Sequence, residues 1–325
     1  MKLPNIAPLD NAAMEKARQR QAELAKPPGS LGRLEDLSIQ LAGITGRVHN
    51  KMEKKHLLVF AADNGVVEEN VSSAPQSVTL MQTINLTRHK TGASTLCRHF
   101  GCGITVCDVG VNAVIREEKV LNRKIAFGTN NMVKGPAMTR QQAETALQTG
   151  IDLAMATEAD VLGVGEMGIG NTTTSSAVLS VLLGADVEAV TGRGGGITDD
   201  SFRKKKDVIR TAIAVNAPDK ADVIDVLSKV GGFDIAAMCG AFLGAAASRR
   251  AVVIDGFISA VAALCAYRLC PEVRGYLVPS HASFEILGAA CAIINDMATF
   301  DQAGIDDGYL DEIREGDKFT VEGKQ

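Results

Sequence analysis

The sequence contains no tryptophan, and aromatic residues make up only 4% of its 325 residues. Binding platforms for single-stranded nucleic acids depend on aromatic side chains, so this composition argues against such a platform. The formal net charge of −4 also lacks the positive excess that attracts nucleic acid. We therefore expect no nucleic-acid partner.

Long apolar segments are absent as well. The richest apolar stretch, residues 236–247, is shorter than a membrane-spanning helix and consists mainly of alanine and glycine. Residues 1–21 have no apolar core of the kind that a signal peptide needs. We therefore expect no membrane association and a cytoplasmic location.

The pairings typical of metal and disulfide sites are missing too. The seven cysteines include no CxxC pair, and the five histidines show no HExxH spacing. An odd number of cysteines in mostly apolar surroundings is typical of buried free thiols in a reducing compartment. We expect no metal site and no metal or redox cofactor.

What the chain does have is an alternation of short strand-like runs with helical patterns. Each run ends in Asp, Gly, Pro or Ser, and the runs cover residues 57–62, 104–109, 161–164, 251–254 and 276–278. This alternation predicts an α/β fold in which helices flank a parallel sheet. Ligands bind beyond the carboxyl ends of the strands in such sheets, so we expect one site built from several strand-end loops.

Residues 165–176, GEMGIGNTTTSS, follow the third run and precede an apolar helical segment. A glycine-rich turn into a helix presents free amides and the positive end of the helix dipole, which suits a phosphate. Asn171 and Thr172 add side-chain donors. Glu166 is a poor neighbour for a phosphate, and we interpret it as a base or as a partner for an N–H-bearing ring. Since Thr and Ser are common N-caps, an ordinary helix start is the alternative.

The same region also matches the dinucleotide pattern GxGxxG through Gly163, Gly165 and Gly168, with Asp186 further on. In that motif the helix packs an apolar face on the strand, whereas residues 171–176 are all polar. A nicotinamide-dependent oxidoreductase is therefore the weaker alternative.

A second glycine cluster, residues 192–196, precedes the basic run 203–206. Glycines permit close backbone approach to a ligand, and a lysine after them can supply a charge to a phosphate. The alternative is a surface loop that leads into a solvated helix. No GxxxxGK[ST] motif occurs, which disfavours nucleoside triphosphates as substrates.

Two further stretches are candidates for ligand contacts. Residues 71–79, VSSAPQSVT, have the composition to line a flat ligand, although a plain polar loop before a helix is the alternative. Residues 279–285, PSHASFE, invite the interpretation of a hydrolase triad, which the absence of GxSxG disfavours. Ser280 and Ser283 are better interpreted as hydrogen-bond donors to a ligand.

Together these motifs resemble the nicotinate-nucleotide–dimethylbenzimidazole phosphoribosyltransferase family of cobalamin lower-ligand assembly. The resemblance extends over roughly residues 10–300, and its motifs occur in the expected order at residues 26–35 (KPPGSLGRLE), 63–82, 165–173 (GEMGIGNTT), 229–234 (KVGGFD), 255–257 (DGF) and 280–283 (SHAS). It implies transfer of phosphoribose from nicotinate mononucleotide to a benzimidazole-type base, with release of nicotinate and formation of an alpha-ribazole-phosphate-type nucleotide. It implies no metal or redox cofactor.

The resemblance also implies an architecture. A large Rossmann-like α/β nucleotide-binding domain would cover residues 51–287, and both chain ends, residues 1–50 and 288–325, would form a small helical domain. Residues 10–25 and 33–43 do have helical spacing, separated by a loop that contains a proline pair. The family further implies a dimer, either a homodimer or a heterodimer with a paralogous chain.

Site residues follow from the resemblance by motif. Glu166 resembles the second carboxylate near the reacting atoms. The residues that resemble the base pocket are Pro75, Gln82 and Met167. The residues that resemble the nucleotide and phosphate contacts are Gly168, Asn171, Thr172, Gly194, Lys205 and Ser283. Lys204 or Lys206 would take the place of Lys205 if the register of this match slips.

The chain departs from the family in three places. Asn64 stands where many members have histidine, and Ala74 replaces a serine of some members, which bears on the base accepted. After Glu285, members continue for a few dozen residues that carry the presumed general base, whereas here Ile286 follows directly. Either that segment is deleted, or it is a mobile loop left out of the sequence. We expect the second.

Two related functions remain as alternatives. One is a phosphoribosyltransferase that uses phenol or p-cresol and is a subunit of a heteromeric enzyme. The other, which a true deletion would favour, is a catalytically silent nucleotide-binding partner subunit.

Overall fold

A parallel β-sheet forms the centre of the protein. The computed structural model describes residues 1–280. Within these residues the strands are β1 (Lys55–Ala62), β2 (Cys102–Gly110), β3 (Val120–Asn122), β4 (Val161–Met167), β5 (Ala251–Ile254) and β6 (Leu277–Pro279). Their order is β3-β2-β1-β4-β5-β6, and every pair is parallel. The predicted parallel α/β fold is confirmed. The strand order reverses between β1 and β4, where a ligand crevice is expected.

The sequence predicted all of these strands except β3, which is three residues long and lies at the sheet edge. So short a strand has no readable pattern. β4 is longer than predicted, because Gly165 and Glu166 continue the pairing with Val59 and Phe60 of β1. Glu166 is therefore fixed in a central strand rather than in a loop.

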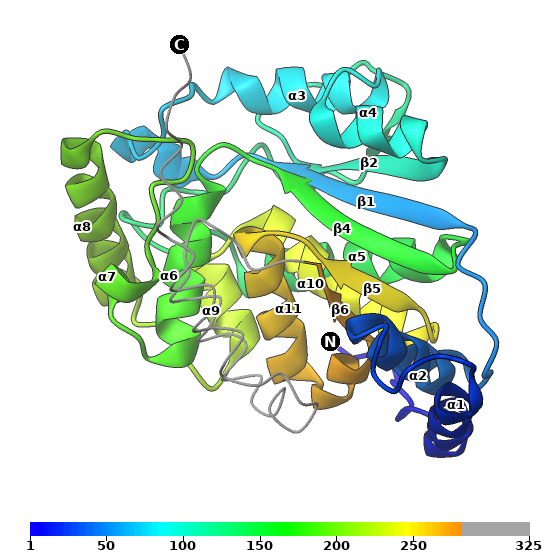
Figure 1. Cartoon of the computed structure of the whole chain (residues 1–325). Coiled ribbons are helices and arrows are strands. Elements are labelled where there is room, and N and C mark those ends of the chain that lie inside the picture. The colour runs from blue at the N-terminus through cyan, green and yellow to red at the C-terminus, as the bar shows by residue number, and fades with distance from the viewer. Residues whose placement is uncertain (281–325) are drawn as a thin grey trace, which may run out of the picture.

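Helices connect the strands and cover both faces of the sheet. Figure 1 shows α3 and α4 on one side and α5, α10 and α11 on the other. The helices are α1 (Asn11–Glu23), α2 (Arg33–Thr45), α3 (Ser77–Thr87), α4 (Gly92–His99), α5 (Arg140–Ala156), α6 (Asn171–Leu183), α7 (Val187–Val190), α8 (Asp199–Asn216), α9 (Val223–Val230), α10 (Phe233–Ala247) and α11 (Phe257–Leu269), with short 3-10 turns η1 (Gly65–Glu69) and η2 (Pro271–Tyr276).

Helix α10 packs against the sheet and is almost completely buried. Its residues from Phe233 to Ala246 are all buried, and it packs closely on α5. A Cβ at Gly150 would lie 1.8 Å from the carbonyl oxygen of Ala237, and one at Gly240 would lie 1.9 Å from that of Leu147. The apolar, glycine-rich run noted in the sequence is thus a core helix. In residues 1–280, no helix has the length and apolar character needed to cross a membrane.

Helices α1 and α2 pack on each other beside the β6 edge of the sheet (Figure 1). The Nε2 atom of Gln40 donates to the carbonyls of Gly275 and Leu277, at 3.0 and 2.9 Å. This pair lies in residues 1–50, the N-terminal segment that was predicted to contribute to a small helical domain, and that domain stays a prediction. The C-terminal half, residues 288–325, lies outside the described residues, so the domain boundaries stay a prediction.

The cysteines of residues 1–280 are all free, as predicted, and most are buried. Cys291 lies outside the described residues. Burial raises the pKa of the Cys265 thiol to about 12. This thiol therefore stays protonated and acts as a small apolar group in the core.

Candidate active site

A group of polar side chains joins the carboxyl ends of β1 and β4 to the first turns of α6 and α10. We refer to it as the strand-end cluster, and it consists of Asn64, Glu166, Asn171, Thr174 and Asp234. Asn171 Nδ2 donates to Glu166 Oε2 (2.5 Å) and to Asp234 Oδ2 (3.1 Å). Asn64 Nδ2 donates to Asp234 Oδ2 at 3.5 Å, and Thr174 Oγ1 donates to Asn64 Oδ1 at 3.1 Å.

Asp234 is a fully buried member of the strand-end cluster, with no exposed surface. Loss of hydration raises the pKa of its carboxyl to about 6, although hydrogen bonds from Asn171, Ile235 and Asn64 act in the opposite direction. The residue lies in the first turn of α10, where the helix dipole favours a negative charge. Its carboxyl is therefore ionised at neutral pH and accepts hydrogen bonds.

Glycines make room for this carboxylate. A Cβ at Gly168 would lie 2.8 Å from Asp234 Oδ2 and 2.3 Å from the carbonyl oxygen of Ala62. A Cβ at Gly232 would lie 2.4 Å from Asp234 Oδ1. Contacts under 3.0 Å are too close for a side chain, so both positions require glycine. The sequence selected Gly168 as a ligand contact, and the structure gives it this packing role as well.

Three of the predicted phosphate contacts come together at the start of α6. The ammonium group of Lys205, which is only 1% exposed, donates to Thr172 Oγ1 (2.8 Å) and to the carbonyl of Gly192 (3.0 Å). A Cβ at Gly194 would lie 2.8 Å from Thr172 Oγ1 and 3.6 Å from Lys205 Nζ. Helix α6 begins at Gly170 without a side-chain cap. A cationic group and a helix N-terminus thus meet at one point, which suits an anion.

The helical register of α8 selects Lys205 over its neighbours. Lys204 is exposed, and Lys206 lies 4.2 Å above the ring of Phe202. Only Lys205 among the three turns toward α6. Asn171, which was also predicted as a nucleotide contact, has its side-chain amide between two carboxylates instead. Ser283 lies outside the described residues.

The predicted base-pocket residues lie on the α3 side of the β4 end. Met167 packs beside Val59 and Leu86 on the opposite sheet face from Glu166, since successive strand residues alternate. Pro75 is exposed in the loop before α3, and Gln82 is half-buried on α3. In residues 1–280, these three positions therefore form a partly exposed surface on that side.

Hydrogen bonds tie this surface to the two glycine segments. Ile169 N donates to Thr79 Oγ1 at 3.1 Å, which sets the start of α3 beside the turn after β4. Ser73 Oγ donates to the carbonyl of Gly195 at 3.2 Å. The three motifs that the sequence marked separately, residues 71–79, 165–176 and 192–196, therefore adjoin one another.

The same structure argues against the dinucleotide interpretation. Gly163 and Gly165 lie inside β4, and only Gly168 lies in the turn that follows. In the dinucleotide motif the glycines form the loop between strand and helix. Asp186, the acidic residue of that pattern, instead caps α7 by accepting from Glu188 N.

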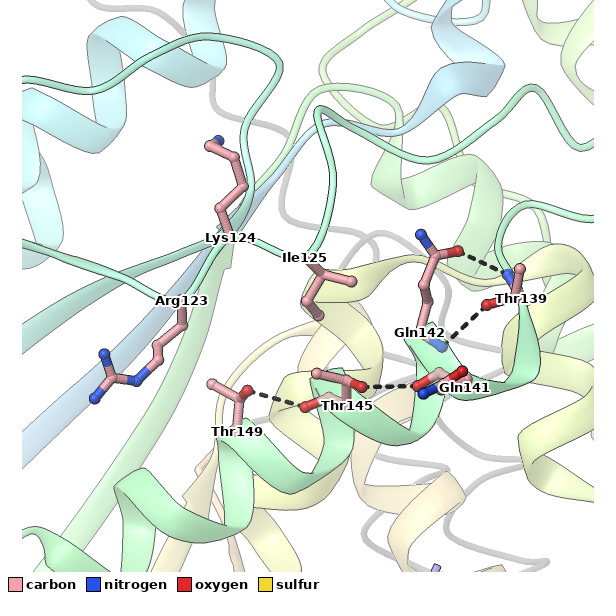
Figure 2. A pocket seen from close by; sticks show the side chains of 8 residues that line it. All are labelled: Arg123, Lys124, Ile125, Thr139, Gln141, Gln142, Thr145 and Thr149. Carbon is pink, nitrogen blue, oxygen red and sulfur yellow. Dashed lines mark hydrogen bonds between the residues drawn. The ribbon is translucent and has the colours of Figure 1, made fainter.

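Two cavities lie away from the strand-end cluster. One, of about 500 Å³, lies between residues 123–125 and α5. Figure 2 shows that the threonines along its α5 side are bound to their own helix: Thr145 Oγ1 donates to the carbonyl of Gln141, and Thr149 Oγ1 to that of Thr145. The other, of about 710 Å³, lies between α1, α2 and η2. Neither contains the buried, converging charges of the strand-end cluster.

Known proteins resemble this chain over most of its length. A family profile described as "Phosphoribosyltransferase" matches residues 6–286. The chain is 44% identical to the nicotinate-nucleotide–dimethylbenzimidazole phosphoribosyltransferase of Clostridium perfringens, with 98% of each chain covered. It is 51% identical to the protein of the same name from Clostridium acetobutylicum, over 87% of this chain and 81% of that one.

The chain belongs to the phosphoribosyltransferase family. The predicted family and enzyme class are confirmed. The fold agrees as well: the crystal structure of CobT from Thermus thermophilus matches with a TM-score of 0.80 at 33% identity, over 91% of this chain and 99% of that chain.

The comparisons also bear on the residues after Glu285. The sequence runs from Glu285 directly to Ile286, and whether a segment is deleted or was left out there stays a prediction. The alignment with the C. perfringens protein spans 355 positions, and this chain has 325 residues, so at least 30 positions of the alignment lack a counterpart here. The family match ends at residue 286, where this departure occurs.

Sequence reasoning gave Asp234 no role of its own, although it noted the motif that contains it. The available signal was a single acidic residue after two glycines, at the start of an otherwise apolar helix. A charge in such a helix needs nearby partners. Those partners, Asn64 and Asn171, come from other parts of the chain.

Proposed function

We propose that this chain transfers phosphoribose from nicotinate mononucleotide to an aromatic lower-ligand base of the benzimidazole type, and so forms an alpha-ribazole-phosphate-type nucleotide. The observation that supports this most is the meeting of Thr172, Gly194 and Lys205 at the N-terminus of α6. This arrangement suits the monophosphate of a mononucleotide. The family relationship supports the choice of substrates, since its relatives are named for them.

The chemistry assigned to Glu166 follows from its position. A ring nitrogen of the base attacks the anomeric carbon, the bond from that carbon to the nicotinate nitrogen breaks, and nicotinate leaves with the electron pair. The new product ring must then lose its N–H proton. We assign Glu166 to accept that proton, because its carboxylate is oriented by Asn171 at the end of β4.

The acceptor pocket is assigned to Pro75, Gln82 and Met167 on the α3 side. We propose that the open surface there takes the flat ring, with Ser73 and the 192–196 segment at its border. Asn64 does not face this surface directly, because its amide is bound to Asp234 and Thr174. We expect the reaction to take place in the cytoplasm.

A true deletion after Glu285 would favour a second candidate, a nucleotide-binding subunit that turns over only with a paralogous chain. A release assay separates the two. Purified chain is mixed with nicotinate mononucleotide and either dimethylbenzimidazole or phenol, and free nicotinate is measured. Release with dimethylbenzimidazole supports the proposed function, and release with phenol alone supports the phenol-using relative. Binding without release, followed by release when a complete family member is added, supports the silent subunit.

The phosphate site has its own test in two matched variants. Lys205→Met removes the buried ammonium and should weaken nicotinate mononucleotide binding by about tenfold to a hundredfold, as expected for a charged hydrogen bond. Lys204→Met removes an exposed charge of the same helix and should change binding by less than about threefold. Calorimetric titration measures both. Equal effects would remove Lys205 from the phosphate site.

A further inference from the structure

The strand-end cluster contains one acidic residue to which the proposed reaction gives no part. Asp234 lies behind Asn171, on the side away from Glu166. In residues 1–280, no lysine or arginine forms an ion pair with it. A buried carboxylate without a cation is costly, so its retention needs a reason.

The hydrogens of the Asn171 amide show what Asp234 can do. Nδ2 carries two hydrogens, and the structure directs one to Glu166 and the other to Asp234. If the amide were flipped, its oxygen would face two carboxylates, so the orientation follows from the chemistry. Glu166 and Asp234 together therefore determine which way the Asn171 amide faces.

The groups that bind the Asp234 carboxyl within residues 1–280 are donors. They are Asn171 Nδ2, Asn64 Nδ2 and the backbone N–H of Ile235. Asn64 is itself held by the hydroxyl of Thr174. The Asp234 carboxylate is thus held in place by Asn64 and Ile235, independently of its hydrogen bond from Asn171. Gly168 and Gly232 enclose it closely, since a Cβ at either position would lie within 3 Å of a carboxylate oxygen.

We propose that Asp234 is a positioning residue, which orients the Asn171 amide so that its other hydrogen holds the Glu166 carboxylate at the end of β4. What Glu166 then does in catalysis rests on the proposed function. The orientation itself is a statement about this chain alone. It accounts for a glycine at both residue 168 and residue 232, because either side chain would displace the acceptor.

Kinetics of single and double variants test the coupling. Asp234→Ala and Asn171→Ala should each lower kcat by about tenfold to a hundredfold, with the affinity for nicotinate mononucleotide changed by less than about threefold. Because both act on Glu166 through one hydrogen bond, the double variant should be no slower than the slower single variant. Asp234→Asn keeps the shape but turns one acceptor into a donor, and its kcat should fall between wild type and Asp234→Ala.

A control separates positioning from a general loss of stability. Asn216→Ala, at the C-terminal end of α8, also removes two buried hydrogen bonds, which the Asn216 amide donates to the carbonyls of Met132 and Ala212. It should lower the melting temperature and leave kcat within about twofold of wild type. If Asp234→Ala behaves like Asn216→Ala, or if the two cluster variants have additive effects on kcat, the proposal is overturned.

Crystal structures of the wild type and of Asp234→Ala, which removes the acceptor completely, decide the question without any turnover. We expect the Asn171 amide to rotate away from Glu166 in the variant. An unchanged Asn171–Glu166 hydrogen bond would refute the positioning role. If the wild-type chain releases no nicotinate with any acceptor or partner, the proposed function fails, and these structures still test the role of Asp234.

Discussion

Two regions of this molecule use glycine for close approach, and they do so for different ends. At the α5–α10 crossing, Gly150 and Gly240 let one helix touch the backbone of the other. In the strand-end cluster, Gly168 and Gly232 let the Asp234 carboxylate enter between backbone segments. The first region is apolar packing, and its energy is spread over many contacts. The second concentrates buried polar groups whose value depends on each partner.

This difference teaches that damage at the two regions should take different forms. At the helix crossing the nearest neighbours of an added Cβ are all backbone atoms, whereas at Gly168 and Gly232 they include side chains that can shift. A change in the strand-end cluster leaves the sheet and helices paired but misplaces a few hydrogen bonds. Stability should therefore report on the first region and turnover on the second.

The largest expected effect is at the helix crossing. Gly240→Val should prevent stable folding, since even a Cβ there would lie 1.9 Å from the carbonyl oxygen of Leu147. Gly92→Ala is the matched control: nothing lies within 4 Å of its Cβ, and alanine favours a helix start by up to about 1 kcal/mol. Urea unfolding measures both. A folded Gly240→Val protein with wild-type stability would contradict the close packing.

Next in size is the loss of the carboxylate at Glu166. Glu166→Gln should lower kcat for nicotinate release by about a hundredfold to ten-thousandfold, the range expected for a proton acceptor. Nucleotide affinity should change far less, because the phosphate contacts lie on the Thr172–Lys205 side. Steady-state kinetics and calorimetry give the two numbers. Equal losses of turnover and affinity would assign Glu166 to binding.

The buried acid predicts a smaller effect that depends on pH. Burial raises the pKa of Asp234 from 3.8 to about 6 in the folded state. Between these values the folded protein binds more protons than the unfolded chain, so this group lowers the unfolding free energy as pH rises through the window. The Asp234→Asn variant has an amide at this position, which does not ionise in this pH range. Its unfolding free energy relative to wild type should therefore rise by up to about 3 kcal/mol between about pH 4 and pH 7.

Urea unfolding of both proteins at several pH values checks this difference, because titrations elsewhere in the protein cancel. A constant difference across the window would mean that burial does not raise the pKa of Asp234. A falling difference would mean that its pKa is lowered.

The smallest expected change in stability is at Gly168. Gly168→Ala should destabilise the protein by about 1 to 3 kcal/mol, since its Cβ would meet one backbone oxygen and two side chains, of Asp234 and Asn64, that can shift. Turnover should fall by at least about tenfold, because the shift moves Asp234. If stability falls as for Gly240→Val while the remaining folded protein keeps full turnover, the two regions do not differ in kind.

The secondary structure and the site motifs were largely predictable. Strand-like runs bounded by Asp and Gly gave five strands and the parallel fold, and GEMGIGNTTTSS gave a turn into a helix at the centre of the site. Short-range pattern sufficed there, because alternation, caps and glycine turns are local properties. The edge strand β3 had too few residues to show a pattern.

The sequence by itself determined the α/β fold class and the chemical types gathered at the strand ends. Tertiary structure alone decided which of these groups meet. Asn171 and Asp234 are 63 residues apart, and Thr172 and Lys205 are 33 apart. Their contacts depend on strand order and on how each helix is rotated about its axis. Successive residues of an α-helix point in directions about 100° apart. That rotation buries Lys205 and leaves Lys204 exposed, a distinction that the basic run itself does not contain.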